Sequence, residues 1–354
     1  MKCDYLIIGQ GLAGSVLAYY LLDKNRSVLV IDDPDLPKSS TVAAGIYNPF
    51  TGRKLVKTWI ADTLFDRIEA FYDKMQGQLG VEFLHKMPMY RPFLSQQEQN
   101  DWVAKADDPA FSRYITNIVA PADALPGIVN PLGGMLLGRC GYLDLGLLIK
   151  QVRSYLVERG LLQLEHFDES SMQIKEGGVA YQNIQARKVV FCDGASLSTS
   201  EMFGWLPLRP VKGEIITVEL ASRLDYMVNR GVFVLPVGGG EYKVGATFNN
   251  KDLSTQPTEE AREQLVQKLK KLISIPFNIT NHGAGIRPAT ADRRPFIGLH
   301  PKFEPLAVFN GLGTKGVSLM PFLAAEFFEF LEQGRPLIPE VAITRHFSLY
   351  YNKF

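Results

Sequence analysis

The first 32 residues contain the pattern that most constrains the fold. It consists of an apolar run, a glycine-rich turn, a stretch with helical periodicity and a second apolar run that ends in an acid. The first run covers residues 5–8, the turn has the sequence GQGLAG at residues 9–14, and the second run ends at Asp32. A strand, glycine turn, helix and strand in this order bind the pyrophosphate and ribose of a dinucleotide. A glycine turn used only for packing is the alternative interpretation.

Each glycine of this turn has a different expected task. Gly9 permits the tight turn, Gly11 allows the backbone to approach the phosphates, and Gly14 lets the helix pack close to the strand. The phosphates would then lie at the N-terminus of the helix, where free N–H groups and the helix dipole favour negative charge. Asp32 follows at close to the spacing of about 20 residues at which a carboxylate binds ribose hydroxyls.

Length and composition predict a globular protein with two domains. The chain has 354 residues, of which 46% are hydrophobic and 21% charged. Its formal net charge is +1, and no block of lysines and arginines resembles a nucleic-acid-binding arm. We therefore expect a small-molecule partner rather than a nucleic acid.

The cysteines and the N-terminus bear on the cellular compartment. Cys3, Cys140 and Cys192 lie far apart, and neither a CxxC pair nor a Cys/His cluster with metal-ligand spacing occurs. This pattern predicts neither a disulfide framework nor a metal site. The first strand is expected within about four residues of the N-terminus, which leaves no room for a signal peptide. No apolar run approaches the ~18 residues of a membrane span, so we expect a cytoplasmic protein.

Two kinds of strand pattern indicate an α/β fold in two parts. Residues 189–192 form a short, fully apolar run, which is typical of a buried parallel strand. Residues 214–220, 232–237 and 242–248 are rich in β-forming residues and predict an antiparallel meander. We expect a discontinuous Rossmann-like domain at residues 1–82, 141–205 and 283–354. An inserted substrate-binding domain with a mixed, largely antiparallel β-sheet would comprise residues 83–140 and 206–282.

Further segments favour a flavin over a nicotinamide cofactor. Residues 39–46, SSTVAAGI, form a small-residue passage against which a large planar ring could lie. Near the C-terminus, GIRPATADRRPFIG at residues 285–298 is followed by FNGLGTKGVS at residues 309–318, a second glycine loop before an amphipathic helix. Backbone N–H groups at this helix N-terminus, together with Lys315, would stabilise the negative charge of a reduced flavin. A nicotinamide dehydrogenase would leave this second loop without a task.

Together these segments closely resemble the D-amino-acid-oxidase-like family of flavoproteins, over nearly the whole chain from Gly9 to about Pro321. The resemblance implies an extended FAD in the Rossmann-like domain and a mixed sheet that covers a substrate cavity. The implied FAD-binding residues are Gly9, Gly11, Leu12, Ala13 and Gly14 at the pyrophosphate, with Cys192, Asp193 and Gly194 beside it; Asp32 and Asp33 at the adenosine ribose; the backbone around Phe167 at the adenine; Thr41, Ala44, Gly45 and Ile46 along the ring; and Gly311, Gly313, Thr314, Lys315, Gly316, Val317 and Ser318 at the pyrimidine end.

The chemistry that the resemblance implies is oxidation of a C–N bond in a small amine or amino acid. A hydride would pass to flavin N5, the imine would be hydrolysed, and oxygen or another carrier would accept the electrons. Such a site needs a cation for the substrate carboxylate, because bidentate anchoring aligns the C–H bond with N5. The resemblance places Arg287 there, and Pro288 favours an extended backbone that projects it into a cavity. A structural pairing of Arg287 with Asp292 or with a carbonyl is the alternative.

The remaining candidates are weaker. Tyr242, on a strand of the expected roof, could offer its hydroxyl to the substrate, with core packing as the alternative. Tyr47, which follows the ring-lining passage, is a further candidate catalytic residue. Arg53 or Lys54 could enter the pocket as a second anion site, although exposed basic residues in a turn are common. Some relatives attach flavin through a cysteine near the C-terminal arginine motif. Because no cysteine follows Cys192, we expect non-covalent FAD.

Two other functions stay open at this point. One is flavin-dependent trimming of a modified tRNA base, which a flavin domain with similar C-terminal motifs performs; the near-neutral charge argues against it. The other is a flavin-binding protein without turnover. The presence of Arg287 argues against this second possibility.

Overall fold

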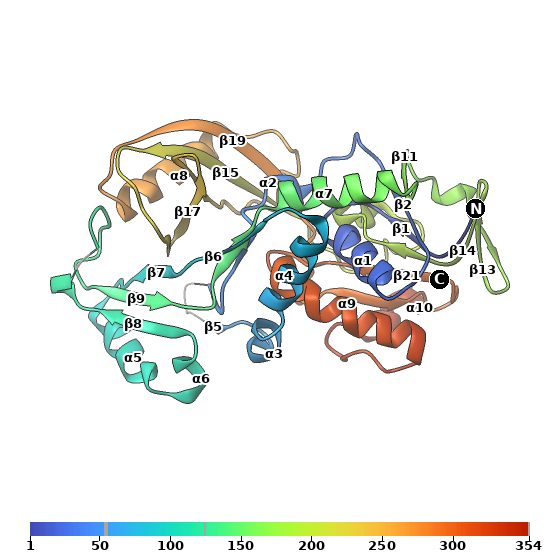
Figure 1. The fold of residues 1–354 in the computed structure, drawn as a ribbon, viewed down its shortest axis with the longest axis horizontal. Coiled ribbons are helices and arrows are strands. Elements are labelled where there is room, and N and C mark those ends of the chain that lie inside the picture. The colour runs from blue at the N-terminus through green and yellow to red at the C-terminus, as the bar shows by residue number, and fades with distance from the viewer. Residues whose placement is uncertain (53–55, 124, 353–354) are drawn as a thin grey trace.

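The computed structural model describes residues 1–52, 56–123 and 125–352. Two large sheets dominate this part of the chain (Figure 1). One surrounds the N-terminal strand β1 (Lys2–Ile8), and the other contains β15 (Val211–Leu220) and β19 (Phe277–Arg287). Arg53 and Lys54, the expected second anion site, lie outside the described residues.

Parallel strands form the centre of the first sheet. In the described residues its order is β11-β2-β1-β14-β13-β12, with β21 beside β14 and β20 beside β21. The bounds are β2 (Val28–Asp32), β11 (Leu162–Leu164), β12 (Gln173–Lys175), β13 (Gly178–Tyr181), β14 (Ile184–Phe191), β20 (Phe296–Leu299) and β21 (Leu306–Asn310). β1 pairs in parallel with β2 and β14, and β14 pairs in parallel with β21. The predicted buried strand at residues 189–192 is thus confirmed.

Both faces of β1 are buried, which explains its uninterrupted apolar run. Tyr5 and Ile7 pack in one hydrophobic cluster, whereas Leu6 and Ile8 pack in a second cluster on the other face. Helices α1 (Leu12–Asp23), α7 (Leu145–Glu158) and α9 (Gly316–Gln333) contribute to the first of these clusters. Figure 1 shows these three helices together beside the sheet.

Helix α1 approaches β1 closely because position 14 has no side chain. A Cβ at Gly14 would lie 1.8 Å from the carbonyl oxygen of Gly9, well inside van der Waals contact. The sequence interpretation of Gly14 as a packing glycine is therefore correct.

Helix α9 contains a proline whose missing N–H group is compensated from another helix. Pro321 cannot donate a hydrogen bond to the carbonyl of Val317, which lies four residues earlier. The hydroxyl of Tyr72, in α4 (Ile68–Leu79), donates to this Val317 carbonyl at 3.0 Å. The proline is thus accommodated within an 18-residue helix.

The second sheet is mixed and largely antiparallel, as predicted. Its order in the described residues is β19-β15-β18-β17-β16-β7-β9-β8, and the β16–β7 pair is parallel. The additional bounds are β7 (Met89–Pro92), β8 (Ile115–Val119), β9 (Gly134–Leu137), β16 (Met227–Arg230), β17 (Val232–Gly238) and β18 (Glu241–Gly245). β19 pairs with β15 as far as Arg287, so the domain boundary expected at residue 283 falls inside a strand.

Side chains of the second sheet alternate between two environments. Val234 of β17 and Val244 of β18 pack in a cluster with α8 (Glu259–Leu272). On the opposite face, a Cβ at Gly245 would lie 2.8 Å from Ile215 Cγ1 and 2.9 Å from Phe233 Cζ. One face therefore carries a helix, and the other faces the rest of the molecule.

The other described elements are short. They are β3 (Ile46–Tyr47), β4 (Phe50–Thr51), β5 (Val56–Lys57), β6 (Leu84–Lys86), β10 (Gly141–Leu143), α2 (Ser39–Val42), α3 (Ala61–Phe65), α5 (Gln96–Ala106), α6 (Pro109–Ser112), α10 (Phe347–Tyr351) and four 3₁₀ segments at Pro121–Asp123, Glu169–Ser171, Gly194–Thr199 and Ile343–His346. Helix α2 contacts β19 of the second sheet. Among the described helices, none has the length and apolar character that a membrane span requires.

A matched pair of glycine substitutions tests the packing of α1. Gly14→Ala should lower the free energy of unfolding by about 3 kcal/mol or more, because the new methyl group must displace backbone. Gly77→Ala is the control: Gly77 lies within α4, a methyl group added there would meet no neighbour within 4 Å, and the substitution should gain about 0.5–1 kcal/mol. Urea unfolding midpoints measure both changes. Equal effects of the two substitutions would contradict the close approach.

Candidate active site

A cavity of about 1200 Å³ lies between the two sheets. Residues at the carboxyl ends of β1, β2 and β14, and in the loop before α9, line one part of it; residues of β15, β17, β18 and β19 line another part. The crevice beyond the carboxyl ends of parallel strands is the usual ligand site of such sheets.

The glycine loop forms an open cradle at the N-terminus of α1. Gly9 has φ +94°, and a Cβ there would lie 2.9 Å from the carbonyl oxygen of Cys192. At Gly11 the nearest atom to a Cβ is Ser40 Oγ at 3.5 Å, so this backbone stays accessible. Leu12 N–H donates to Ser40 Oγ at 3.1 Å, and the N-cap residue Gly11 has no side chain with which to satisfy a further N–H group. The remaining free N–H groups suit a phosphate.

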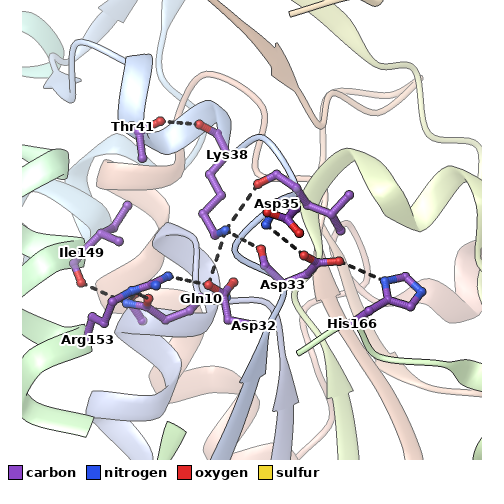
Figure 2. Close-up of polar contacts among 11 residues, drawn as sticks. Gln10, Asp32, Asp33, Asp35, Lys38, Thr41, Ile149, Arg153 and His166 are labelled. Carbon is purple, nitrogen blue, oxygen red and sulfur yellow. Dashed lines mark hydrogen bonds and ion pairs between the residues drawn. The ribbon is translucent and has the colours of Figure 1, made fainter. Parts of the chain in front are cut away.

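Asp32 is buried at the end of β2 and is held by three donors (Figure 2). Its Oδ1 accepts from the backbone N–H of Gln10 at 2.8 Å. Its Oδ2 accepts from Arg153 of α7 at 2.5 Å and forms an ion pair with Lys38 at 3.3 Å. Arg153 also donates to the side chain of Gln10 at 2.8 Å. Gln10, Lys38 and Arg153 were not among the site residues predicted from the sequence, and no local pattern links Arg153 of α7 to the loop.

Asp33 and Phe167 both line the adjoining part of the cavity. Asp33 accepts from the backbone N–H of Asp35 at 2.9 Å, and its Oδ2 lies 2.9 Å from His166 Nδ1 (Figure 2). The hydrogen bond with His166 is the main reason that the pKa of Asp33 is lowered. The Phe167 ring packs on Tyr181 with ring centroids 4.6 Å apart, and Asp33, His166 and Phe167 all line the cavity.

Cys192, Asp193 and Gly194 also line the cavity, directly beside the glycine loop. Burial raises the pKa of Asp193 to about 7, although a hydrogen bond from Asn310 at 3.0 Å opposes the shift. A carboxyl group with this pKa changes its charge near neutral pH. A phosphate nearby would favour its protonated form further, because like charges repel.

Only some residues of the passage expected to lie along the flavin ring, residues 39–46, line the cavity. Ala44, Gly45 and Ile46 line it, as expected, together with residues of α2. Thr41 does not line it: its side chain is exposed and its hydroxyl donates to the carbonyl of Lys38 at 2.8 Å. Gly45 lies so close to β10 that a Cβ would be 2.0 Å from the carbonyl oxygen of Leu143.

The loop before α9 presents a second uncapped helix N-terminus to the cavity. Gly313, Thr314, Lys315, Gly316 and Val317 line it, and no side chain caps α9. Three other expected cofactor residues do not line the cavity: Gly14 packs on β1, Gly311 lies against Thr290, and Ser318 is fully buried in α9.

Lys315 is the charged group at this second helix N-terminus. Its Nζ donates to the backbone carbonyl and to the side-chain Oδ1 of Asn48, both at 3.2 Å. Burial lowers the pKa of Lys315 to about 8, so the ammonium group remains mostly protonated at neutral pH. No carboxylate forms an ion pair with Lys315 in the described residues. Asn48, which follows β3 directly, was not among the predicted site residues.

Arg287 ends β19 and lies flat against β15. A Cβ at Gly213 would be 1.9 Å from Arg287 Nη2, so only glycine leaves space for the guanidinium. Nη1 donates to the carbonyl of Thr247 at 3.2 Å, and burial lowers the pKa of the group. Asp292, the alternative partner, instead accepts from Arg345 at 2.8 Å. Within the described part of the chain Arg287 forms no ion pair with a carboxylate.

The two candidate tyrosines are not brought to the cavity. Gly245 of β18 is on the cavity face, and side chains alternate along a strand, so Tyr242, three residues earlier, is on the opposite face. It packs there in the cluster that contains α8, and its hydroxyl accepts from the N–H of Leu224 at 2.9 Å. Tyr47 is fully buried, and its hydroxyl lies 3.4 Å from Glu69. Neither residue belongs to the cavity lining.

Charge is distributed unevenly along the cavity. The acidic residues among the described lining residues all lie near the ends of β2, β11 and β14; they are Asp32, Asp33, Asp168, Glu169, Asp193 and Glu201. The part lined by β7, β15, β17, β18 and β19 has Arg91 and Arg287 but no described acid. The acidic side chains therefore suit ligand hydroxyl groups, beside the N–H groups of the glycine loop that suit a phosphate, whereas the part lined by the second sheet suits an anionic substrate group.

These residues fit FAD. The open glycine cradle and the second helix N-terminus each offer free N–H groups, and Lys315 at the second helix N-terminus carries a charge without an ionic partner among the described residues. The cavity extends from Asp32 to Arg287, so a long ligand can lie along it.

Comparison with known proteins agrees with this interpretation. Glycine oxidase of Pseudomonas putida is 24% identical over 96% of this chain and 97% of that protein. The tRNA 5-methylaminomethyl-2-thiouridine biosynthesis bifunctional protein MnmC of Leptospira interrogans is 23% identical over 96% of this chain, which spans 59% of its length. The crystal structure of glycine oxidase from Geobacillus kaustophilus covers 98% of this chain with a TM-score of 0.79 at 18% identity, with 98% of that structure aligned.

A family model settles the broader assignment. The model described as FAD dependent oxidoreductase (DAO) matches residues 4–329, which is most of the chain. The cradle at Gly9 and the anion-favouring loop at Lys315 fit the cofactor of that family. This chain therefore belongs to the DAO family of FAD-dependent oxidoreductases and is a flavoenzyme.

Proposed function

We propose that this enzyme oxidises the C–N bond of a small amino acid or amine that carries a carboxylate, and that the resulting imine is hydrolysed. The observation that carries the proposal is the guanidinium of Arg287, which lines the cavity with a backbone carbonyl as its described partner. A charged group in such a position needs a counter-ion, and a substrate carboxylate provides two oxygens in the matching geometry.

Bound FAD supplies a two-electron acceptor, and the protein supplies orientation and electrostatics. Arg287 fixes the carboxylate, so that the carbon bearing the amine has one orientation relative to the cofactor. Phe233 and Ile215 provide an apolar wall on the second sheet that excludes water. Because this end of the cavity has no described acid, the amine has no carboxylate to hold it as a cation. We infer that the amine binds in its neutral form and needs no strong base.

The cofactor contacts complete the proposal. Gly9, Gly11 and Ala13 would hold the pyrophosphate and Asp32 the ribose. Lys315, oriented by Asn48, would stabilise negative charge at the pyrimidine end. Burial raises the pKa of Cys140 and of Cys192, and no described cysteine forms a disulfide. These inert thiols support non-covalent FAD and the reducing cytoplasm.

A second candidate is trimming of a modified base in tRNA. It is favoured by the similarity to the tRNA-modifying protein of Leptospira interrogans, which extends over 96% of this chain. The cationic end of the cavity would accept an acidic substituent on a base as well as a free amino acid. The two candidates differ in the size of the molecule that must reach Arg287.

Anaerobic mixing with a panel of glycine, sarcosine, proline and D-amino acids tests the first candidate. At least one of them should bleach the visible flavin band, because reduction of the flavin removes that absorbance. If all amino acids fail and tRNA that still carries the acidic amine substituent on its modified base bleaches the band, the second candidate replaces the first. A protein that no compound of either class reduces would contradict both.

Substitution of Arg287 tests the anchor. Arg287→Met should keep the FAD absorbance but weaken the binding of a carboxylate inhibitor by about 10- to 100-fold, as expected for the loss of a charged hydrogen-bonded pair. Arg287→Lys should restore part of the affinity, since it keeps the charge without the bidentate fork. Flavin difference titration measures both. Unchanged affinity in Arg287→Met would remove this residue from the substrate site.

The pH dependence of stability tests the environment of Lys315. In the FAD-free protein its pKa is about 8, whereas an unfolded lysine has 10.5, so below pH 8 burial of the charged form destabilises the fold. Lys315→Met should therefore unfold at a higher temperature than wild type at pH 7, with a gain of about 1–3 kcal/mol. The difference should shrink as pH rises from 8 to 10.5.

Lys270→Met, on the exposed side of α8, is the control for a general charge effect. Its stability difference from wild type should stay near zero across the same pH range. A Lys315→Met difference that does not depend on pH would show that the folded lysine titrates normally.

A further inference from the structure

A second arginine lines the cavity at a place that the sequence analysis did not single out. Arg91 lies on β7 and is 7% exposed. Its neighbour Tyr90 packs in the cluster that contains α8, and Met89 packs in the other cluster. By the alternation of a strand, Arg91 therefore shares the face of Met89, away from α8. Arg91 belongs to the lining of the same cavity as Arg287.

The guanidinium of Arg91 lacks a counter-ion among the described residues. Nη2 donates to the carbonyl of Gly52 at 3.2 Å, and Nε is buried without a hydrogen-bond partner. Glu98, whose negative charge acts on Arg91, is already used by Arg230, which holds both of its carboxylate oxygens at 2.8 and 2.6 Å. Glu98 also accepts from the backbone N–H of Leu94 at 2.8 Å.

The electrostatic environment makes this arrangement costly without a ligand. The pKa of Arg91 is lowered to about 10, mainly by burial and also by the positive charge of Arg230. The negative charge of Glu98 opposes this shift. Arg91 therefore remains charged at neutral pH. A buried charge without an ionic partner is strongly unfavourable, and a guanidinium is best satisfied by a planar oxyanion.

The two unpaired arginines are far apart on the sheet. Arg287 is on β19 and Arg91 on β7, with β15, β18, β17 and β16 between them. At a strand spacing of ~4.8 Å, the five spacings put the two strands on the order of 24 Å apart across the sheet. One carboxylate cannot satisfy both groups, whereas an elongated molecule with two acidic ends can.

We propose that Arg91 is a second anion anchor and that the preferred substrate is an amine with two carboxylates. One carboxylate binds Arg287 beside the oxidised C–N bond, and the other binds Arg91 at the far end of the cavity. N-carboxyalkyl amino acids and acidic amino acids with an extended side chain belong to this class. The inference rests on the function proposed above, since it takes Arg287 as the first anchor.

Difference titration of the FAD-loaded enzyme with non-reacting acids tests the second anchor. Dicarboxylates from succinate to sebacate are compared with monocarboxylates of the same chain length. At the best length the dicarboxylate should bind about 10- to 100-fold more tightly, as expected for one additional charge-assisted pair. Equal affinity of diacids and monoacids at every length in the wild-type enzyme would overturn the proposal without the need for any variant.

Substitutions then assign the effect. Arg91→Met should abolish the preference for diacids and leave the affinity for monoacids unchanged, whereas Arg287→Met should weaken both classes. Lys268→Met, which removes a partly exposed cation from the same cavity, should keep the preference. A preference that survives in Arg91→Met would assign it to another residue and overturn the proposal.

The same data separate this inference from the function on which it rests. Monoacids that bind through Arg287 with no advantage for diacids would contradict the second anchor alone. If no carboxylate perturbs the flavin spectrum, both proposals fail.

Discussion

The parallel pairing of β1 with β14 is the interaction on which the site depends. It joins the N-terminal strand to a segment from the middle of the chain, with Lys2 opposite Gln185 and Ile8 opposite Phe191. β21, close to the C-terminus, adds to the other side of β14. Because all three strands run in the same direction, the loops that follow them meet at one edge. The glycine loop, Asp193 and the loop before α9 converge there.

Two cations that line the cavity, Lys315 and Arg287, have no compensating negative charge among the described residues. Lys315 and Arg287 have oxygen acceptors of the backbone or of an amide, but no described carboxylate forms an ion pair with either. In each case burial lowers the pKa, which is the signature of a cation that has lost water without gaining a counter-ion. Three other arginines differ in that each forms an ion pair with a carboxylate; they are Arg153, Arg230 and Arg345. The contrast supports a role in ligand binding for the unpaired groups.

The sequence was sufficient where function depends on local backbone geometry. The glycine loop, the buried strand at residues 189–192 and the loop before α9 follow from spacing alone, because each is a contiguous segment. Position in space was harder to predict. Successive side chains of a strand point to opposite faces of the sheet, and the sequence does not specify which face of β18 borders the cavity. In the structure Tyr242 lies on the face toward α8. Arg153 and Arg91 reach the site from α7 and β7, and no motif links those elements to it.

A crystal structure of the FAD-loaded enzyme with a bound dicarboxylate tests the central claim most directly, namely that substrate acid groups neutralise the unpaired cations. We predict both oxygens of one carboxylate at about 2.7–3.1 Å from the guanidinium nitrogens of Arg287. A ligand bound elsewhere, with Arg287 still on the carbonyl of Thr247 or paired with an acid of the protein, would contradict it.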